Sequence, residues 1–89
     1  MSSIRNLKKD INNVLGDVIE AVYIVEHSKS QEGSQEGTAI IDQAIETFDH
    51  LIAEVNKKKV DNRKAHLKKV RQTLQEEATA LVEQINKMP

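Results

Sequence analysis

The sequence contains no cysteine and no tryptophan, and its 89 residues include only one tyrosine, one phenylalanine and one proline. Without cysteine the chain forms no disulfide, holds no iron–sulfur cluster and performs no thiol catalysis. With Tyr23 and Phe48 as its only aromatic residues, it cannot build the row of stacked rings on which single-stranded nucleic acids bind. These absences direct attention to the charged and aliphatic side chains.

Long hydrophobic runs are also missing. No stretch approaches the roughly 18 apolar residues of a membrane span. The first ten residues carry Arg5, Lys8 and Lys9 without the apolar region of a secretory signal behind them. We therefore expect a soluble, cytoplasmic protein with no membrane association. A chain of this length makes one domain, and a domain so small buries only roughly 60–65% of the surface that its unfolded chain exposes.

Apolar residues recur at steps of three and four along three segments, which is typical of helices with one buried face. The pattern predicts helices at about 4–27, 38–57 and 62–87, with a flexible loop at 29–37. The short break between the second and third helices makes them antiparallel neighbours. The expected fold class is all-α, a three-helix up-down-up bundle that forms one domain over residues 1–89.

Some residues mark where these helices begin or bend. Ser2 or Ser3 can cap the first helix, and Asp61 the third, by accepting a hydrogen bond from a backbone N–H. Gly16 interrupts the first helix and should cost about 1 kcal/mol relative to alanine. We therefore expect a neighbouring helix to cross close to Gly16.

The linker repeats Ser-Gln-Glu-Gly in tandem over residues 30–37, a composition typical of a flexible polar connection. Two interpretations are open. Ser30 and Ser34 can belong to a docking or modification site, or the repeat is a slipped duplication that a surface loop tolerates at little cost in free energy. We favour the duplication.

Charge is distributed unevenly along the chain. Eight of the 13 Lys and Arg residues fall within 57–71 against one acid, Asp61, so this segment carries +7 and the rest of the chain −8. Such a segment can attract an acidic protein partner through a salt-sensitive field, or contact nucleic-acid phosphates without specificity. The pI of about 6.3 and the lack of a nucleic-acid-binding motif favour the acidic protein. The candidate partner-binding residues are Lys57, Lys58, Lys59, Arg63, Lys64, Lys68 and Arg71.

The segment 18–25 is apolar almost all round its predicted helix. A three-helix monomer buries such a helix on one side only, and exposed contiguous apolar patches usually mark interfaces. We therefore predict self-association through Ile19, Tyr23 and Ile24, with a homodimer favoured. The alternative is a fourth contact inside an unusually wrapped monomer.

Glu46, His50 and Glu54 follow one another at steps of four residues, so they share one helix face on which a divalent metal could bind. That face lies opposite Phe48 and Val55 and is therefore the solvated one. We expect an ordinary charged surface there, with no metal and no cofactor. No set of acid, base and nucleophile converges elsewhere, so the chain is expected not to be an enzyme.

Three short stretches and the lysine-rich turn carry a resemblance. These stretches are Lys9-Asp10-Ile11, Val18-Ile19-Glu20-Ala21 and Phe48-Asp49-His50-Leu51-Ile52. With them the chain resembles small uncharacterised all-helical bacterial proteins of Bacteroidetes type, which implies a helical bundle and supplies no function. From the residues themselves we expect a non-enzymatic interaction or scaffold protein that self-associates and offers its basic segment to an acidic partner.

Overall fold

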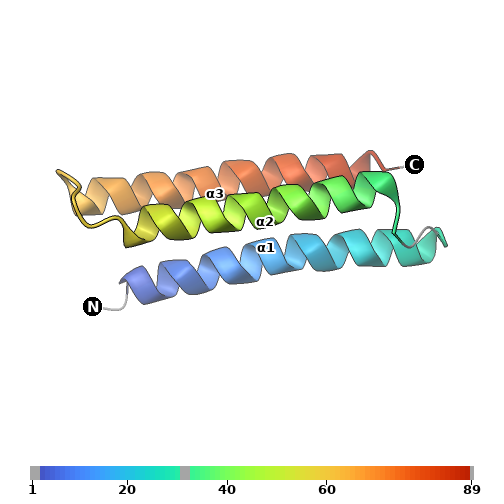
Figure 1. Cartoon of the computed structure of the whole chain (residues 1–89), viewed down its shortest axis with the longest axis horizontal. Helices are drawn as coiled ribbons and strands as arrows, with labels where there is room; N and C mark the ends of the chain where they lie inside the picture. The colour runs from blue at the N-terminus through green and yellow to red at the C-terminus, as the bar shows by residue number, and fades with distance from the viewer. Residues whose placement is uncertain (1–2, 31–32, 89) are drawn as a thin grey trace.

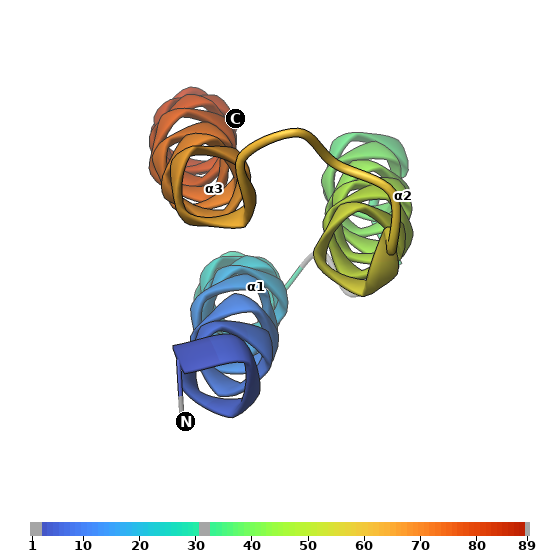
Figure 2. The ribbon, with the colours of Figure 1, turned by 90° about the vertical axis from the view of Figure 1, so that its left-hand side faces the viewer.

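The computed structural model describes residues 3–30 and 33–88, which fold into three helices. They are α1 (Ser3–Ser28), α2 (Gln35–Asn56) and α3 (Arg63–Asn86). The helices run up, down and up along a rod of 48 × 18 × 16 Å (Figure 1). Seen along the rod they occupy the corners of a triangle (Figure 2). The predicted all-α, three-helix up-down-up bundle is confirmed.

One apolar core runs the length of the rod, because each helix turns its stripe of aliphatic side chains inward. Full burial of one such side chain stabilises the fold by about 1.5–3 kcal/mol. Phe48 is half-buried at the edge of this core. The buried apolar residues are Leu7, Ile11, Leu15, Val18, Val22, Ile40, Ala44, Leu51, Val55, Val70, Leu74, Leu81, Ile85 and Met88.

The predicted flexible loop at 29–37 is wrong in its second half, because α2 begins at Gln35. Ser34 is the N-cap, and its Oγ accepts a hydrogen bond from the Gly37 backbone N at 3.0 Å. Ser34 also donates to Glu26 Oε2 at the end of α1, from its backbone N at 3.0 Å and from its Oγ at 2.6 Å. The second copy of the repeat therefore starts a helix and ties that start to α1.

Gly37 is required by this arrangement. Glu26 is only 2% exposed and packs against Gly37 so closely that a Cβ there would overlap Glu26 Oε2 and lie 2.8 Å from Glu26 Cδ. Ser30 and Gly33, in the first copy, have positive φ angles of 55° and 74°. Glycine adopts this left-handed conformation without steric cost, which accounts for Gly33 but not for Ser30. Only the second copy therefore has a structural role that contacts in the described residues support, through Ser34 and Gly37.

Three local predictions differ from the structure or lie outside it. Asn62, not Asp61, caps α3, and its Oδ1 accepts from the Ala65 backbone N at 3.1 Å. Gly16 is exposed, and a Cβ built on it meets nothing within 4 Å, so the expected close crossing of a neighbouring helix is wrong within this chain. Of the two proposed caps of α1, Ser2 lies outside the described residues, and only the backbone of Ser3 is described.

Candidate functional site: a cationic end and two apolar grooves

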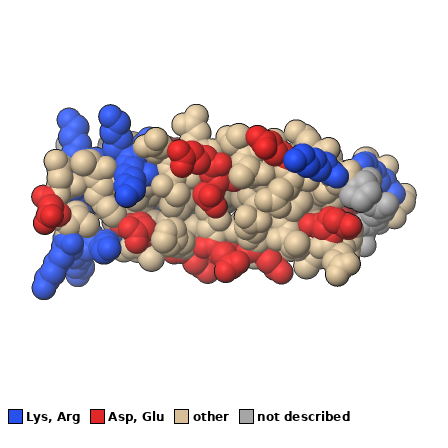
Figure 3. All heavy atoms as spheres, turned by 90° about the horizontal axis from the view of Figure 1, so that it is seen from above, with Lys and Arg blue, Asp and Glu red and all other residues tan. Residues whose placement is uncertain are grey.

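Basic residues from two distant parts of the sequence meet at one end of the rod. Helices α1 and α3 both begin at this end, and the α2–α3 connection lies there too (Figures 1 and 2). We define the cationic end as residues 3–10 and 54–71. It holds eleven of the 13 basic residues and three acids, a net charge of +8, whereas the rest of the chain carries −9. Figure 3 shows Lys and Arg gathered at this end and Asp and Glu along the middle.

The fold therefore enlarges the basic segment that the sequence predicts. Arg5, Lys8 and Lys9 join it from the first turns of α1. The predicted up-down-up order already places the starts of the first and third helices at one end, so this addition could have been inferred from the sequence, but the sequence analysis did not draw it. Neither helix has an acid in its first turn. The positive ends of the two helix dipoles, each equivalent to about half a charge, thus add to the field of the side chains.

Few of these cations are neutralised. Arg71 Nη1 donates to Asp10 Oδ2 at 2.9 Å, and both side chains are about half exposed. His66 Nε2 lies 2.7 Å from the Glu54 backbone O, and it must be the donor because a carbonyl only accepts. Among the described residues, no other Lys or Arg of the cationic end makes an ion pair or a side-chain hydrogen bond. The remaining charges are available to a partner.

A groove of about 730 Å³ opens between α1 and α3 at the cationic end. Its floor is apolar and consists of Ile4 and Leu7 of α1 and Leu67 of α3. Its basic side chains all come from the predicted partner-binding set: they are Arg63, Lys64, Lys68 and Arg71. The structure thus places four of the seven predicted residues around one apolar depression, which we call the cationic groove.

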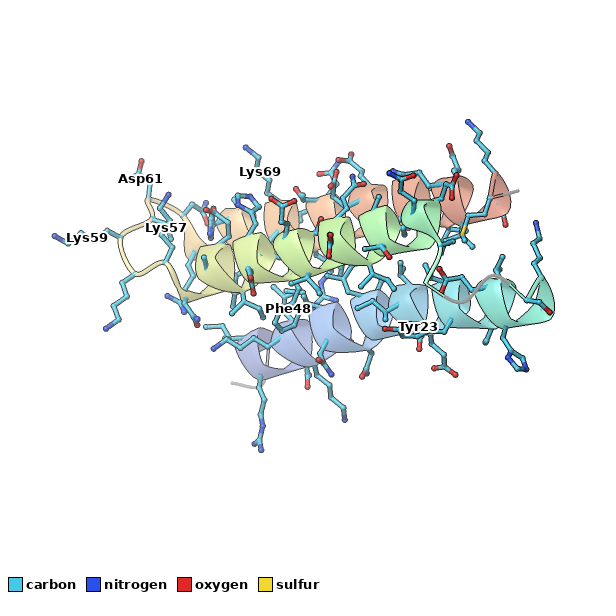
Figure 4. All side chains as sticks on the ribbon, turned by 45° about the vertical axis from the view of Figure 1, so that its right-hand side comes forward. Tyr23, Phe48, Lys57, Lys59, Asp61 and Lys69 are labelled. Atoms are coloured by element: carbon cyan, nitrogen blue, oxygen red, sulfur yellow. The ribbon has the colours of Figure 1, made fainter. Side chains whose placement is uncertain are left out.

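The other three predicted cations lie outside the cationic groove. Lys57, Lys58 and Lys59 belong to the α2–α3 connection, and Figure 4 shows Lys59 pointing outward from it. Lys69 is also outside, because it lines a small cavity between α2 and α3 with His50, His66 and others. These side chains contribute to the field around the cationic end rather than to the walls of the groove.

A second stretch of about 690 Å³ continues the groove between the same two helices toward the middle of the rod. Arg71 lines both stretches, and Val18, Leu74 and Val82 form part of the second floor. Acidic side chains such as Glu83 border this second stretch. The α1–α3 groove therefore has a positive end and a negative end.

The predicted interface residues do not all lie on one face. Ile19 lines a cavity of about 190 Å³ between α1 and α2, together with Gly16, Ile45 and Phe48 among others. Tyr23 follows Ile19 by one turn and is therefore on the same side of α1, where it is 57% exposed.

Ile24 stays apart from this cavity. It is 60% exposed, but as the next residue after Tyr23 it points about 100° away around the helix. Ile45, which the sequence analysis did not select, is 48% exposed and belongs with Ile19. We call Gly16, Ile19, Tyr23, Ile45 and Phe48 the Gly16 face.

The acidic stripe of α2 has no metal-binding geometry. Glu46 and His50 are exposed, and Glu54 Oε1 lies 3.8 Å from His66 Nε2. Within residues 3–30 and 33–88, no group of three or more His, Asp or Glu side chains is arranged to hold a metal ion. The contact between His66 and the Glu54 carbonyl instead ties the end of α2 to the start of α3.

No protein family, curated protein or solved structure matches the chain. The resemblance to small bacterial helical proteins therefore stays a prediction, and any function must be argued from the geometry. In the part of the chain that the structure describes, no helix is both long enough and apolar enough to cross a membrane.

Proposed function

We propose that this chain is a non-enzymatic interaction protein that self-associates and binds an acidic protein segment through its cationic end. The observation that carries the proposal is the cationic groove. There an apolar floor of Ile4, Leu7 and Leu67 lies among four basic side chains, at the end of the rod with a net charge of +8.

The chemistry of the groove favours an amphipathic acidic helix as the bound segment. A helix lying between α1 and α3 would complete a four-helix arrangement, with its leucine-type side chains on the floor. Its Asp and Glu side chains would then lie near Arg63, Lys64 and Lys68. The charges would steer the encounter, and the apolar contact would slow dissociation.

A nucleic acid suits the groove less well. Phosphates pair with Lys and Arg but bury no apolar floor. The two rings that could stack on bases, Tyr23 and Phe48, are outside the cationic end. Non-specific binding of a duplex to the same lysines is therefore the competing outcome that a test must distinguish.

A calorimetric titration with defined probes makes the distinction. The first probe is a peptide of about 18 residues, some 27 Å of helix, with leucines on one face and glutamates on the flanks. The second has the same composition in scrambled order, and the third is a DNA duplex of similar length. We expect the amphipathic peptide to bind more tightly than the scrambled one, and its affinity to fall as salt rises.

The variant Arg63→Glu/Lys64→Glu/Lys68→Glu reverses the charge of three of the four basic side chains of the groove. All three residues are exposed, so the fold should persist, and the affinity for the peptide should fall roughly tenfold or more. The matched control is Lys69→Glu, at the same end but outside the groove, which should change the affinity far less. Equal binding of both peptides, or tighter binding of the duplex than of either, would refute the proposal.

A further inference from the structure

No contact within the described residues explains why a glycine lies in the middle of α1. It is the fourteenth of the 26 residues of α1, where glycine weakens a helix by about 1 kcal/mol relative to alanine. A Cβ added to it would meet nothing within 4 Å, whereas one added to Gly37 would overlap Glu26. A mid-helix glycine can permit close approach of another backbone, but no other part of the described chain comes within 4 Å of a Cβ built on Gly16.

The surroundings of Gly16 are those of an interface. The adjacent cavity is lined mainly by apolar side chains, including Ile19, Ala44 and Phe48. Two of the four large apolar side chains that the described residues expose most are nearby: Ile45 lines the cavity, and Tyr23 follows Ile19 by one turn on the same side of α1. Figure 4 shows Phe48 between α1 and α2. The Gly16 face is thus a shallow apolar depression at the middle of the rod.

We propose that a second copy of this chain covers the Gly16 face, in an antiparallel dimer whose twofold axis passes near Gly16. Gly16 of each copy then lets α1 of the other approach closely. Isologous twofold contacts of this kind are the commonest way in which identical chains assemble. The paired faces bury Ile19, Tyr23 and Ile45 of both copies.

Charge selects the antiparallel orientation. A parallel pair would place two ends of +8 side by side, whereas an antiparallel pair places each cationic end along the acidic remainder of the other copy. The same pattern holds on the face itself. Arg5 and Lys9 precede Gly16 by eleven and seven residues, and Glu20 follows it by four, so all three share its side of α1.

If the cationic end binds acidic segments as proposed, the dimer has a further consequence. The cationic ends of the two copies point in opposite directions along the assembly. Both cationic grooves stay open, because they lie between α1 and α3 and not on the α1–α2 side. The dimer would therefore bridge two acidic partners, or bind one partner with two acidic segments more tightly through the raised effective concentration.

Light scattering after size exclusion, over a range of protein concentrations, tests the dimer. The expected mass is twice the 10.0 kDa of the chain. Gly16→Arg should return the mass to that of the monomer while the chain stays folded, because the added side chain meets open space and arginine is a good helix former. The matched control is Ile24→Arg, on another side of α1, which should leave the doubled mass unchanged.

Disulfide trapping tests the orientation, since the chain has no cysteine of its own. Lys9 and Tyr23 lie seven residues on either side of Gly16. In the antiparallel dimer, Lys9→Cys mixed with Tyr23→Cys should form the mixed disulfide, and each alone should form little. Cross-linking of each variant with itself would overturn the antiparallel arrangement.

Two further outcomes would overturn the interface. One is a monomer at every concentration, and the other is a doubled mass that Gly16→Arg leaves unchanged. The first outcome would also remove self-association from the proposed function. Neither outcome bears on the binding of an acidic segment, because the amphipathic peptide can be titrated into a monomer. Loss of peptide binding with an intact dimer would instead refute only the proposed binding of an acidic segment.

Discussion

Replacing Gly37 with alanine tests the contact between Glu26 at the end of α1 and Ser34 at the start of α2. The added methyl group cannot share its place with the Glu26 carboxylate, which is almost fully buried, so that group must move. Moving it disturbs two hydrogen bonds from Ser34, of 3.0 and 2.6 Å. Hydrogen bonds of this type contribute about 1.5–3 kcal/mol each when a charged group takes part.

The gain in helix propensity from glycine to alanine is at most about 1 kcal/mol and offsets only part of this loss. We expect Gly37→Ala to lower the free energy of unfolding by roughly 2–3 kcal/mol. For a domain of this size that corresponds to a fall in Tm of about 10–20 °C. Thermal and urea unfolding followed by circular dichroism measure both quantities.

The matched control is Gly16→Ala, the same change at a position where the methyl group meets nothing. It should raise the stability of the monomer by about 0.5–1 kcal/mol. The two substitutions are therefore expected to act with opposite signs. If Gly37→Ala also stabilised the chain, Glu26 would not occupy the position next to Gly37, and the account of the linker would be refuted.

Three smaller predictions concern the core and the α2–α3 connection, and all are measured by urea unfolding. Asn62→Ala should lower stability by about 1 kcal/mol and Asp61→Ala by much less, since only Asn62 caps α3; equal losses would contradict this. His66→Ala should cost about 0.5–1.5 kcal/mol through its bond to the Glu54 carbonyl, and no loss would show that bond to be unimportant. Leu81→Ala should cost about 2–5 kcal/mol, because Leu81 is fully buried, and a loss below 1 kcal/mol would place it outside the core.

The spacing of aliphatic residues was enough to predict the fold class. Each helix carries an apolar stripe at steps of three and four, and turning three such stripes toward one another buries them in one core. Leu7, Leu51 and Leu81, one from each helix, are almost completely buried as this pattern requires. Such patterns specify which residues face inward, and they do so without knowledge of any contact.

Helix ends were harder to predict, because they depend on contacts between distant residues. The sequence shows Ser34 and Gly37 as loop residues, since serine and glycine are typical of loops. It contains no sign that Glu26 would be buried against them and so order the start of α2. At the start of α3, Asp61 and Asn62 are both good caps by type. The backbone geometry decides between them.

The candidate site could be predicted in part. The density of lysine and arginine between 57 and 71 was visible in the sequence. The contribution of Arg5, Lys8 and Lys9 followed from the predicted up-down-up order, which starts α1 and α3 at the same end, but the sequence analysis did not combine the two. The cationic groove also has an apolar floor, which favours a protein partner over a nucleic acid. This floor could be recognised only in the folded structure. The spacing of residues along a single helix does not show a groove that forms between two helices.

The central claim is that the cationic groove binds an acidic amphipathic segment. The most direct measurement is an NMR titration of the isotope-labelled protein with the amphipathic peptide. We predict shifts concentrated in residues 4–10 and 63–71, on both walls of the groove, and weak shifts with the scrambled peptide. Shifts confined to the lysines of the α2–α3 connection, or equal shifts with both peptides, would contradict the claim and leave only non-specific charge attraction.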